Sequence, residues 1–268
     1  MSDLLNTVSA QNAVSNAYDQ LTQPFQRLST GSQLTTPTDN PAAYSIAQNL
    51  LLQLNGTQQA ENNVATGMNV LQTESGGMSN ALDILQTMST LAVEGASGTL
   101  TQGDLNNINT EFQQLNAEVG NIAQNTTFNG TSLLNGSNSS INIQSGPGVG
   151  RQTSLPTGNI TPKNIGLSGA GTQTQAQSEA AITSVANAME GVLAQESAVG
   201  AAQNGLTSTA ASLANSAEST ASSLAQITDA NIASEAGNLV ADRIRLQASV
   251  YTLSAANQQK GLILNLLV

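Results

Sequence analysis

The stretch AYSIAQNLLLQLNGTQQAENNVATGMNVLQTESGGMSNALDIL, residues 43–85, decides the fold. Mostly apolar residues recur along it at alternating spacings of three and four, which places them on one side of a continuous α-helix. The stripe holds for about six heptads, far longer than an ordinary globular helix, so it predicts a coiled coil or a helical bundle. Its members are Ala43, Ala47, Leu50, Leu54, Thr57, Glu61, Val64, Met68, Leu71, Ser75, Met78, Leu82 and Leu85.

Capping and turn residues mark the boundaries of this long helix. Asp39 or Asn40 can cap its start, with Pro41 at the first helical position, where a proline sacrifices no hydrogen bond. The Gly-Gly pair at 76–77 is expected to loosen the helix locally. The glycine-containing segment 95–103 is expected to end it.

Two further stripes predict a second and a third long helix. The second helix closes at Asn129-Gly130, and the third matches the first in length. The stripe of the second helix is Leu105, Ile108, Phe112, Leu115, Val119 and Ile122. The stripe of the third is Ile182, Val185, Met189, Val192, Glu196, Val199, Gln203, Leu206, Ala210, Leu213, Ala217, Thr220, Leu224 and Ile227.

Both chain ends are also predicted to be helical and to pair with each other in antiparallel orientation. At the N-terminal end, Pro24 is expected to interrupt or bend a stripe formed by Val14, Tyr18, Leu21, Phe25 and Leu28. At the C-terminal end, the stripe is Leu239, Leu246, Val250, Leu253, Asn257, Leu264 and Leu267. Chain ends are normally polar, so apolar ends imply that something outside this chain covers them. A two-helix pair is too thin to be stable alone.

The middle of the chain has a different character. Residues 136–175 are rich in Gly, Pro, Asn and Ser, and SINIQ at 140–144 alternates as a short strand does. The predicted fold is therefore mainly α, a long antiparallel coiled coil or bundle of the N- and C-terminal segments with a small β-hairpin region. We expect a terminal coiled-coil domain of 1–35 and 229–268 and a bundle domain of 36–228.

Composition excludes several classes of function. The 268 residues include no Cys and no His, which removes thiol chemistry, Cys/His metal sites and imidazole catalysis. The formal charge of −11 disfavours nucleic acid and anionic membranes. Asp104, Glu111 and Glu118, spaced by seven, indicate a solvent-facing helix side. We therefore predict no enzymatic activity, cofactor, metal, nucleic-acid partner or membrane association.

Short motifs near both ends occur in a fixed order. Near the N-terminus these are RLSTG (27–31), DNPAA (39–43) with IA (46–47), and TFNG (127–130) with LL (133–134). Near the C-terminus they are AAQN (201–204), ITDANIASE (227–235) and LNLL (264–267). Together they resemble the terminal signatures of bacterial flagellins, in a short form with little or no variable outer domain.

The resemblance implies a structural subunit of the extracellular flagellar filament that polymerises with itself for motility. The terminal domain would line an inner tube and the bundle domain an outer tube. It also implies secretion by a type III route, which agrees with the lack of a basic, apolar signal segment before Arg27. Its partners would be the export apparatus, an export chaperone, and cap and junction proteins. Two alternatives are a flagellar hook–filament junction protein and a secreted coiled-coil binding module such as an adhesin.

Two sets of candidate site residues follow. Residues expected to contact neighbouring subunits are Leu4, Val8, Val14, Tyr18, Leu21, Phe25, Arg27, Leu28, Asp229, Leu239, Arg243, Leu246, Val250, Leu253, Leu264 and Leu267. The second set is a patch by which many flagellins engage an innate immune receptor. Leu91 and Glu111 match it, but Thr87 stands where the family has an Arg. Losing a bidentate cation predicts weak or absent receptor activation.

Overall fold

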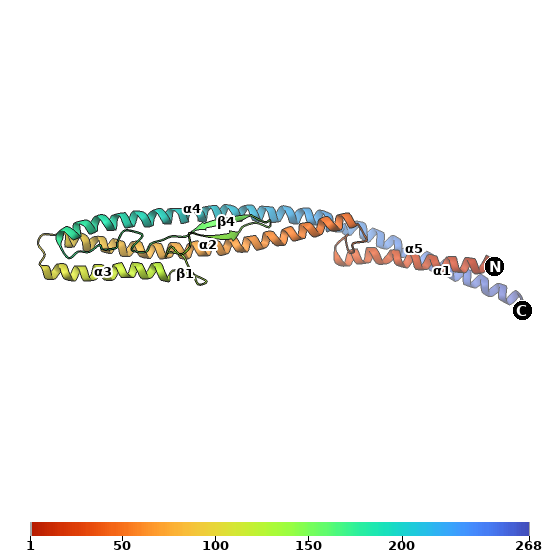
Figure 1. Cartoon of the computed structure of the whole chain (residues 1–268). Helices are drawn as coiled ribbons and strands as arrows, with labels where there is room; N and C mark the ends of the chain where they lie inside the picture. The colour runs from red at the N-terminus through yellow and green to blue at the C-terminus, as the bar shows by residue number, and fades with distance from the viewer. Residues whose placement is uncertain (1, 268) are drawn as a thin grey trace. The chain divides into compact units, whose positions relative to one another are not determined.

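The computed structural model describes the backbone of residues 2–267 and the side chains of residues 6–259. Within that range the chain forms five helices and four short strands (Figure 1). They are α1 (Ser2–Thr30), α2 (Pro41–Gly95), α3 (Gln102–Asn125), β1 (Thr127–Phe128), β2 (Thr131–Ser132), β3 (Ser140–Gln144), β4 (Gln152–Pro156), α4 (Gln175–Thr228) and α5 (Ile232–Leu267). The predicted fold class, mainly α with a small hairpin region, is confirmed.

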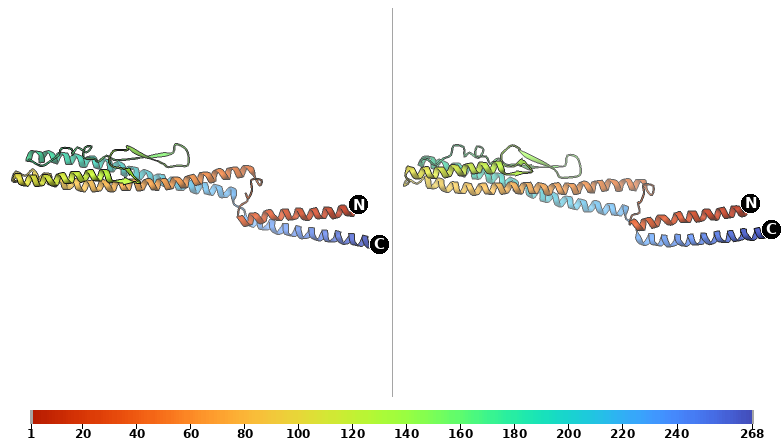
Figure 2. Two further views of the ribbon diagram at one scale, coloured as in Figure 1. Left: turned by 60° about the horizontal axis from the view of Figure 1, so that its bottom comes forward. Right: turned by 90° about the horizontal axis from the view of Figure 1, so that it is seen from below.

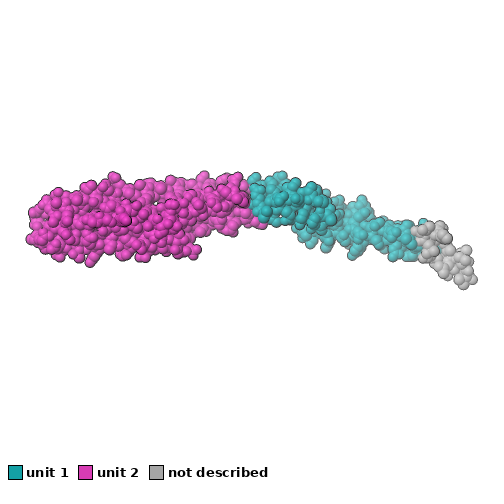
Figure 3. Space-filling model, viewed as in Figure 1, with its two compact units in different colours: residues 1–54, 218–268 teal, residues 55–217 magenta. Residues whose placement is uncertain are grey.

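The chain divides into two compact units (Figure 3). The terminal unit comprises Met1–Leu54 and Glu218–Val268, and the bundle unit comprises Asn55–Ala217. Both long helices, α2 and α4, contribute residues to each unit. The predicted domains, 1–35 with 229–268 and 36–228, concern roles in assembly, and they remain a proposal.

Side-chain caps fix where the helices begin. The Asn40 side-chain oxygen accepts a hydrogen bond from the Ala43 N–H at 3.1 Å, so Asn40 caps α2 and Pro41 is its first residue, as predicted. Thr101 and Asp104 form a reciprocal capping box at α3. Asn231 caps α5 by accepting from the Ser234 N–H at 3.1 Å. Helix starts are thus specified locally in the sequence.

Two helices continue through residues that were expected to disturb them. Pro24 was expected to interrupt or bend α1, and the helix is not interrupted there. Pro24 is buried, and packing of α1 along α5 offsets the loss of one backbone hydrogen bond. α2 also runs unbroken through Gly76 and Gly77. A Cβ at Gly77 would lie 2.7 Å from atoms of both Leu134 and Thr126, so this glycine allows close packing.

In the bundle unit, α2, α3 and α4 run alongside one another around a continuous apolar core (Figures 1 and 2). Every residue of the three predicted stripes is buried or half-buried. Phe112 of α3 is the largest fully buried side chain of that core. Its other fully buried members are aliphatic side chains and methionines, including Leu71, Met78, Leu85, Met88, Leu133, Leu134, Leu155, Ile160, Leu167 and Leu206.

Two antiparallel hairpins complete the bundle unit. The β1–β2 hairpin turns through Asn129 and Gly130, whose φ values of 47° and 78° give the twist that two-residue hairpins favour. The β3–β4 hairpin pairs Ser140 with Pro156 through Gln144 with Gln152. A Cβ at Gly67 of α2 would lie within 3.3 Å of Ile143, Leu155 and Leu206, so this glycine brings hairpin and α4 together. The second hairpin lies within the predicted 136–175 region, whereas the first precedes it.

In the terminal unit, α1 and α5 lie side by side in antiparallel orientation, as predicted for the first and last helices (Figure 2). Their buried and half-buried residues recur with heptad spacing and form the seam between them. We call this set the seam: Thr7, Ala10, Val14, Ala17, Leu21, Pro24 and Leu28 of α1, and Glu235, Leu239, Asp242, Leu246, Ser249, Leu253 and Ala256 of α5.

Candidate assembly surface

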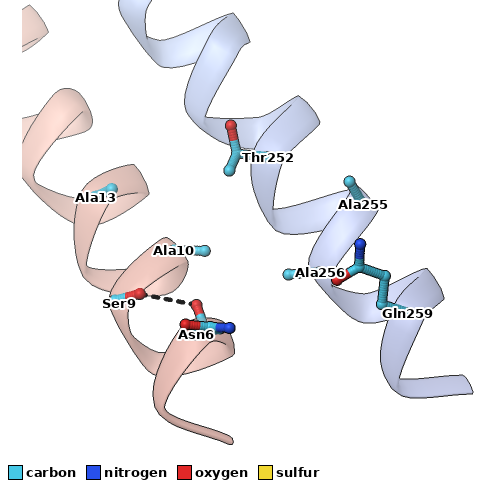
Figure 4. A pocket seen from close by; sticks show the side chains of 8 residues that line it. All are labelled: Asn6, Ser9, Ala10, Ala13, Thr252, Ala255, Ala256 and Gln259. Carbon is cyan, nitrogen blue, oxygen red and sulfur yellow. Dashed lines mark hydrogen bonds between the residues drawn. The ribbon is translucent and has the colours of Figure 1, made fainter. Parts of the chain in front are cut away.

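The seam between α1 and α5 combines half-buried valine and leucine side chains with small ones such as Ala10, Ala17 and Ala256. Near the chain ends the two helices bound a groove of about 420 Å³ (Figure 4). Its lining residues are alanines and short polar residues, namely Asn6, Ser9, Ala10, Ala13, Thr252, Ala255, Ala256 and Gln259. Burying an alanine removes little apolar area from water, so this part of the seam contributes little stability.

Several large apolar side chains of the same two helices lie outside the seam and are exposed. Eight of them are 49–77% exposed, one of which is Ile232 at the start of α5. We call the other seven the outer apolar face: Val8, Tyr18, Phe25, Val240, Ile244, Val250 and Tyr251. Val240, Ile244 and Tyr251 are spaced by four and seven residues, which places them on one stripe of α5. At about 100° of rotation per residue, that stripe lies opposite the seam residues Asp242 and Ser249. Large apolar side chains that remain exposed outside the seam mark an interaction site.

The predicted subunit-contact residues divide between these two surfaces. Val8, Tyr18, Phe25 and Val250 belong to the outer apolar face, and Arg243 and Asp229 are not part of the seam. Six others are half-buried in the seam and contact the partner helix of the same chain: Val14, Leu21, Leu28, Leu239, Leu246 and Leu253. Leu4, Leu264 and Leu267 lie outside the residues whose side chains are described.

Sequence reasoning missed three members of the outer apolar face. Val240, Ile244 and Tyr251 form a second stripe on α5, on the side of the helix away from the seam stripe through Leu239 and Leu246. The signal was present as spacing by four and seven residues. A helix that carries two apolar stripes has one for its partner in the chain and one for another surface.

Arg27 has partners within its own chain. Its Nη1 donates to Glu235 Oε1 at 3.2 Å, and its Nη2 lies 4.0 Å from Asp39 Oδ1. Glu235 and Asp39 side chains are only 10% and 7% exposed, so both ion pairs are shielded from solvent. Arg27 therefore links α1 to α5 and to the α1–α2 connector.

Asp39 organises that connector. It accepts hydrogen bonds from the backbone N–H and the hydroxyl groups of Thr35 and Thr36, and from Gln23 at 3.2 Å. These hydrogen bonds, led by that of the Thr36 N–H, lower the pKa of Asp39 to about 2. The Gln33 N–H also donates to the Thr228 carbonyl at 2.7 Å. The connector is thus a folded joint whose carboxylate stays charged down to about pH 2.

The connector also pairs with the segment between α4 and α5. The Ala230 N–H donates to the Gly31 carbonyl at 2.9 Å, and Ser32 and Asp229 form a β-bridge. Gly31 has a φ of 70°, which favours glycine at this helix end. Asp229, predicted as a subunit contact, is therefore engaged through its backbone within the chain.

The receptor-patch equivalents lie on two neighbouring helices of the bundle unit. Thr87 of α2 is exposed, and its hydroxyl donates to the Asp83 carbonyl at 3.1 Å. Leu91, one turn further along α2, is half-buried, and Glu111 of α3 is exposed. No cation stands at position 87 to complete the patch.

The described part of the chain offers neither a cluster of metal-binding side chains nor a membrane-spanning helix. It holds no group of three or more Asp, Glu, His or Cys residues arranged to bind a metal ion. None of its helices has an apolar segment long enough to cross a membrane.

Comparison with known proteins accounts for this architecture. The model of the bacterial flagellin N-terminal helical region matches residues 1–139. The model of the bacterial flagellin C-terminal helical region matches residues 182–267. The chain belongs to the bacterial flagellin family. It is a structural subunit of the flagellar filament, as the motifs at both ends predicted.

Relatives of similar length support the short flagellin form. A flagellin of Halalkalibacterium halodurans is 29% identical over 98% of both chains. The flagellar filament 30.7 kDa core protein of Treponema maltophilum is 27% identical over 93% of both chains. These full-length matches confirm a flagellin with little room for a variable outer domain.

Solved structures share the fold. The crystal structure of Bacillus cereus flagellin has a TM-score of 0.52 at 25% identity, and the match covers 57% of this chain and 88% of that one. A putative flagellar hook-associated protein from Vibrio parahaemolyticus has a TM-score of 0.60 at 16% identity, with 71% of this chain and 100% of that one covered. The second likeness, at 16% identity, shows a shared fold only.

Proposed function

We propose that the terminal unit of this flagellin builds the filament, with the outer apolar face of α1 and α5 contacting neighbouring copies. The observation that carries this proposal is the set of large apolar side chains that the helix pair leaves exposed. Tyr18, Phe25, Ile244 and Tyr251 remain in solvent, although leucines of the same helices are half-buried in the seam. Covering those side chains removes apolar area from water, at about 25 cal/mol per Å².

The two predicted domains then have different roles. Residues 1–35 and 229–268 form the inner tube, and residues 36–228 form the outer tube. The half-buried seam residues, such as Leu21 and Leu246, hold the two terminal helices together and extend the apolar surface at its edges. Arg243, exposed on α5, is available to fix the register between copies.

Polymerisation of the purified full-length chain on filament seeds tests this function. We expect open filaments that lengthen with added protein, seen by electron microscopy. A chain lacking residues 1–30 or 232–268 is expected to stay monomeric under the same conditions. A junction protein would not propagate on its own, and a binding module would form a finite oligomer of fixed size. Either of those results from the intact chain would contradict the proposal.

The remaining partners come with membership of the family. We propose that the chain is secreted by the flagellar type III apparatus. An export chaperone would bind it before secretion, and cap and junction proteins would contact it at the ends of the filament. In this role it is a purely structural protein without catalytic activity.

The side chain at position 87 also leads to an expectation about receptor activation. Because Thr87 offers one hydroxyl where a guanidinium would donate several hydrogen bonds, purified monomer is expected to activate the flagellin receptor weakly. Thr87→Arg is expected to raise the response by about tenfold or more, since it adds a charge-assisted contact. Dose–response curves in receptor-expressing cells measure this. Thr73→Arg, at an exposed threonine of the same helix, is the control. Equal responses from all three chains would refute the assignment.

A further inference from the structure

Glu74 is a fully buried carboxyl group in the core of the bundle unit. Its Oε1 accepts a hydrogen bond from the Gly158 backbone N–H at 2.7 Å, across 84 residues of sequence. Its Oε2 is buried and has no hydrogen-bond partner. An ionised carboxylate in such a place lacks the second donor that would compensate its loss of hydration.

The segment that meets Glu74 is held from its other side by α4. The Gln195 side-chain oxygen accepts from the Asn159 N–H at 2.8 Å, and its amide group donates to the Asn159 carbonyl at 3.3 Å. The segment 157–160 is thus clamped between a side chain of α2 and a side chain of α4. The Ile160 N–H also bonds to the Leu134 carbonyl at 2.9 Å.

Gly158, whose N–H bonds to the carboxyl group, is closely packed on its other sides. A Cβ at Gly158 would lie 2.5 Å from Gln195 Oε1, 2.7 Å from Met78 Cε and 3.1 Å from Leu134 Cδ2. The first two distances are shorter than real Cβ atoms show. The segment 157–160 is therefore tightly packed where it meets Glu74, and Glu74 Oε2 is shielded from solvent.

The charged groups on the surrounding elements do not compensate Glu74. On α4, Glu196 follows Gln195 directly and is half-buried. Its carboxylate carries a negative charge, as an ionised Glu74 would. Glu118 on α3 is exposed and bonded to Asn121, and Lys163, beyond the clamped segment, is also exposed. Burial raises the pKa of Glu74 to about 7, and the Gly158 hydrogen bond only partly opposes that rise.

We propose that Glu74 is a proton-binding site that makes the closure of this clamp depend on pH. With the carboxyl group protonated, the clamp is closed and the segment 157–160 is packed between α2 and α4. When the proton leaves to solvent, the carboxylate draws water toward Oε2 and the segment loosens. The segment follows β4 directly, so the same event loosens the attachment of the β3–β4 hairpin.

The direction of the pH dependence follows from the two pKa values. The group has a pKa near 4.5 in the unfolded chain and about 7 in the folded one, so the folded state retains its proton over that interval. The contribution to stability is complete below about 4.5 and is lost as the pH rises toward about 7. From pH 5 to pH 8, Glu74 alone should raise the unfolding equilibrium constant on the order of 50-fold.

Denaturant unfolding of the full-length monomer at pH 5 and pH 8 tests the proposal, with Glu74→Gln as the neutral mimic of the protonated acid. The variant is expected to lose most of that pH-dependent change. Asp83→Asn, which removes an exposed carboxylate from the same helix, should retain it. An unchanged pH dependence in the Glu74→Gln chain would overturn the proposal.

Two measurements on the wild-type chain do not depend on how the variant folds. Carboxyl carbon resonances should show Glu74 titrating near neutral pH, whereas titration with the pKa of an ordinary glutamate would contradict the proposal. Hydroxide catalysis alone raises amide exchange rates roughly tenfold for each pH unit. If deprotonation of Glu74 opens the segment, the exchange rates of the Gly158 and Asn159 amides should rise by more than this between pH 6 and pH 8. A rise equal to that effect would also contradict it.

Discussion

Aspartate in place of both Ile244 and Tyr251 is expected to abolish polymerisation while leaving the monomer folded. Both side chains are exposed in the isolated chain, at 61% and 77%, so charges there are hydrated and should change monomer stability by less than about 0.5 kcal/mol. In a filament the same positions would be covered by a neighbouring copy. Each buried, unpaired carboxylate would then cost several kcal/mol per subunit contact.

Sedimentation and electron microscopy after seeding measure this effect, and circular dichroism checks that the helices are intact. The conservative chain Ile244→Leu with Tyr251→Phe keeps the apolar surface and is expected to polymerise normally. Normal polymerisation of the aspartate chain would exclude this stripe of α5 from the subunit contact.

Phe112→Ala is expected to lower the free energy of unfolding of the bundle unit by about 3–5 kcal/mol. Phe112 is the one aromatic ring that is fully buried within the described residues, and its neighbours are aliphatic side chains and methionines. Removing it leaves a cavity that three long helices with fixed spacing cannot easily close. Denaturant or thermal unfolding followed by circular dichroism measures the loss.

Phe25→Ala provides the matched control, because it removes the same ring from a 63% exposed position on α1. Its unfolding free energy should change by less than about 0.5 kcal/mol, whereas its polymerisation should weaken. The two phenylalanines therefore separate stability from assembly. Similar stability losses in both chains would show that the terminal unit packs more tightly than its seam indicates.

Heptad spacing predicts the long helices of this chain well, and the reason is physical. Along α2 and α4 the stripe residues are buried or half-buried for their whole length, so periodicity and burial coincide. Caps such as Asn40 act within a few residues and are equally readable. The fold class follows from these two kinds of local signal.

The terminal pair was harder to predict because two registers fit the same spacing rule. The stripe through Val14, Tyr18, Leu21, Phe25 and Leu28 uses the large residues, whereas the observed seam alternates Val14, Leu21 and Leu28 with Ala10, Ala17 and Pro24. Size usually indicates the interior. Here Leu21 and Leu28 lie in the seam whereas Tyr18 and Phe25 are exposed, so side-chain size does not separate the two registers.

The clamp around Glu74 could not be predicted from the sequence. Glu74 and Gly158 are 84 residues apart, and neither lies in a recognisable motif. Glu74 stands next to Ser75, which the predicted stripe assigned to the interior, and only the path of the segment 157–160 explains why a carboxyl group is buried there. Contacts of this kind depend on tertiary packing and not on local pattern.

A helical reconstruction of the filament by electron cryo-microscopy tests most directly whether the terminal unit builds the filament. We predict that Tyr18, Phe25, Ile244 and Tyr251 are covered by α1 or α5 of neighbouring copies, with the α1–α5 seam kept within each subunit. A filament in which these four side chains remain in solvent, and in which the bundle units alone make the contacts, would contradict this prediction.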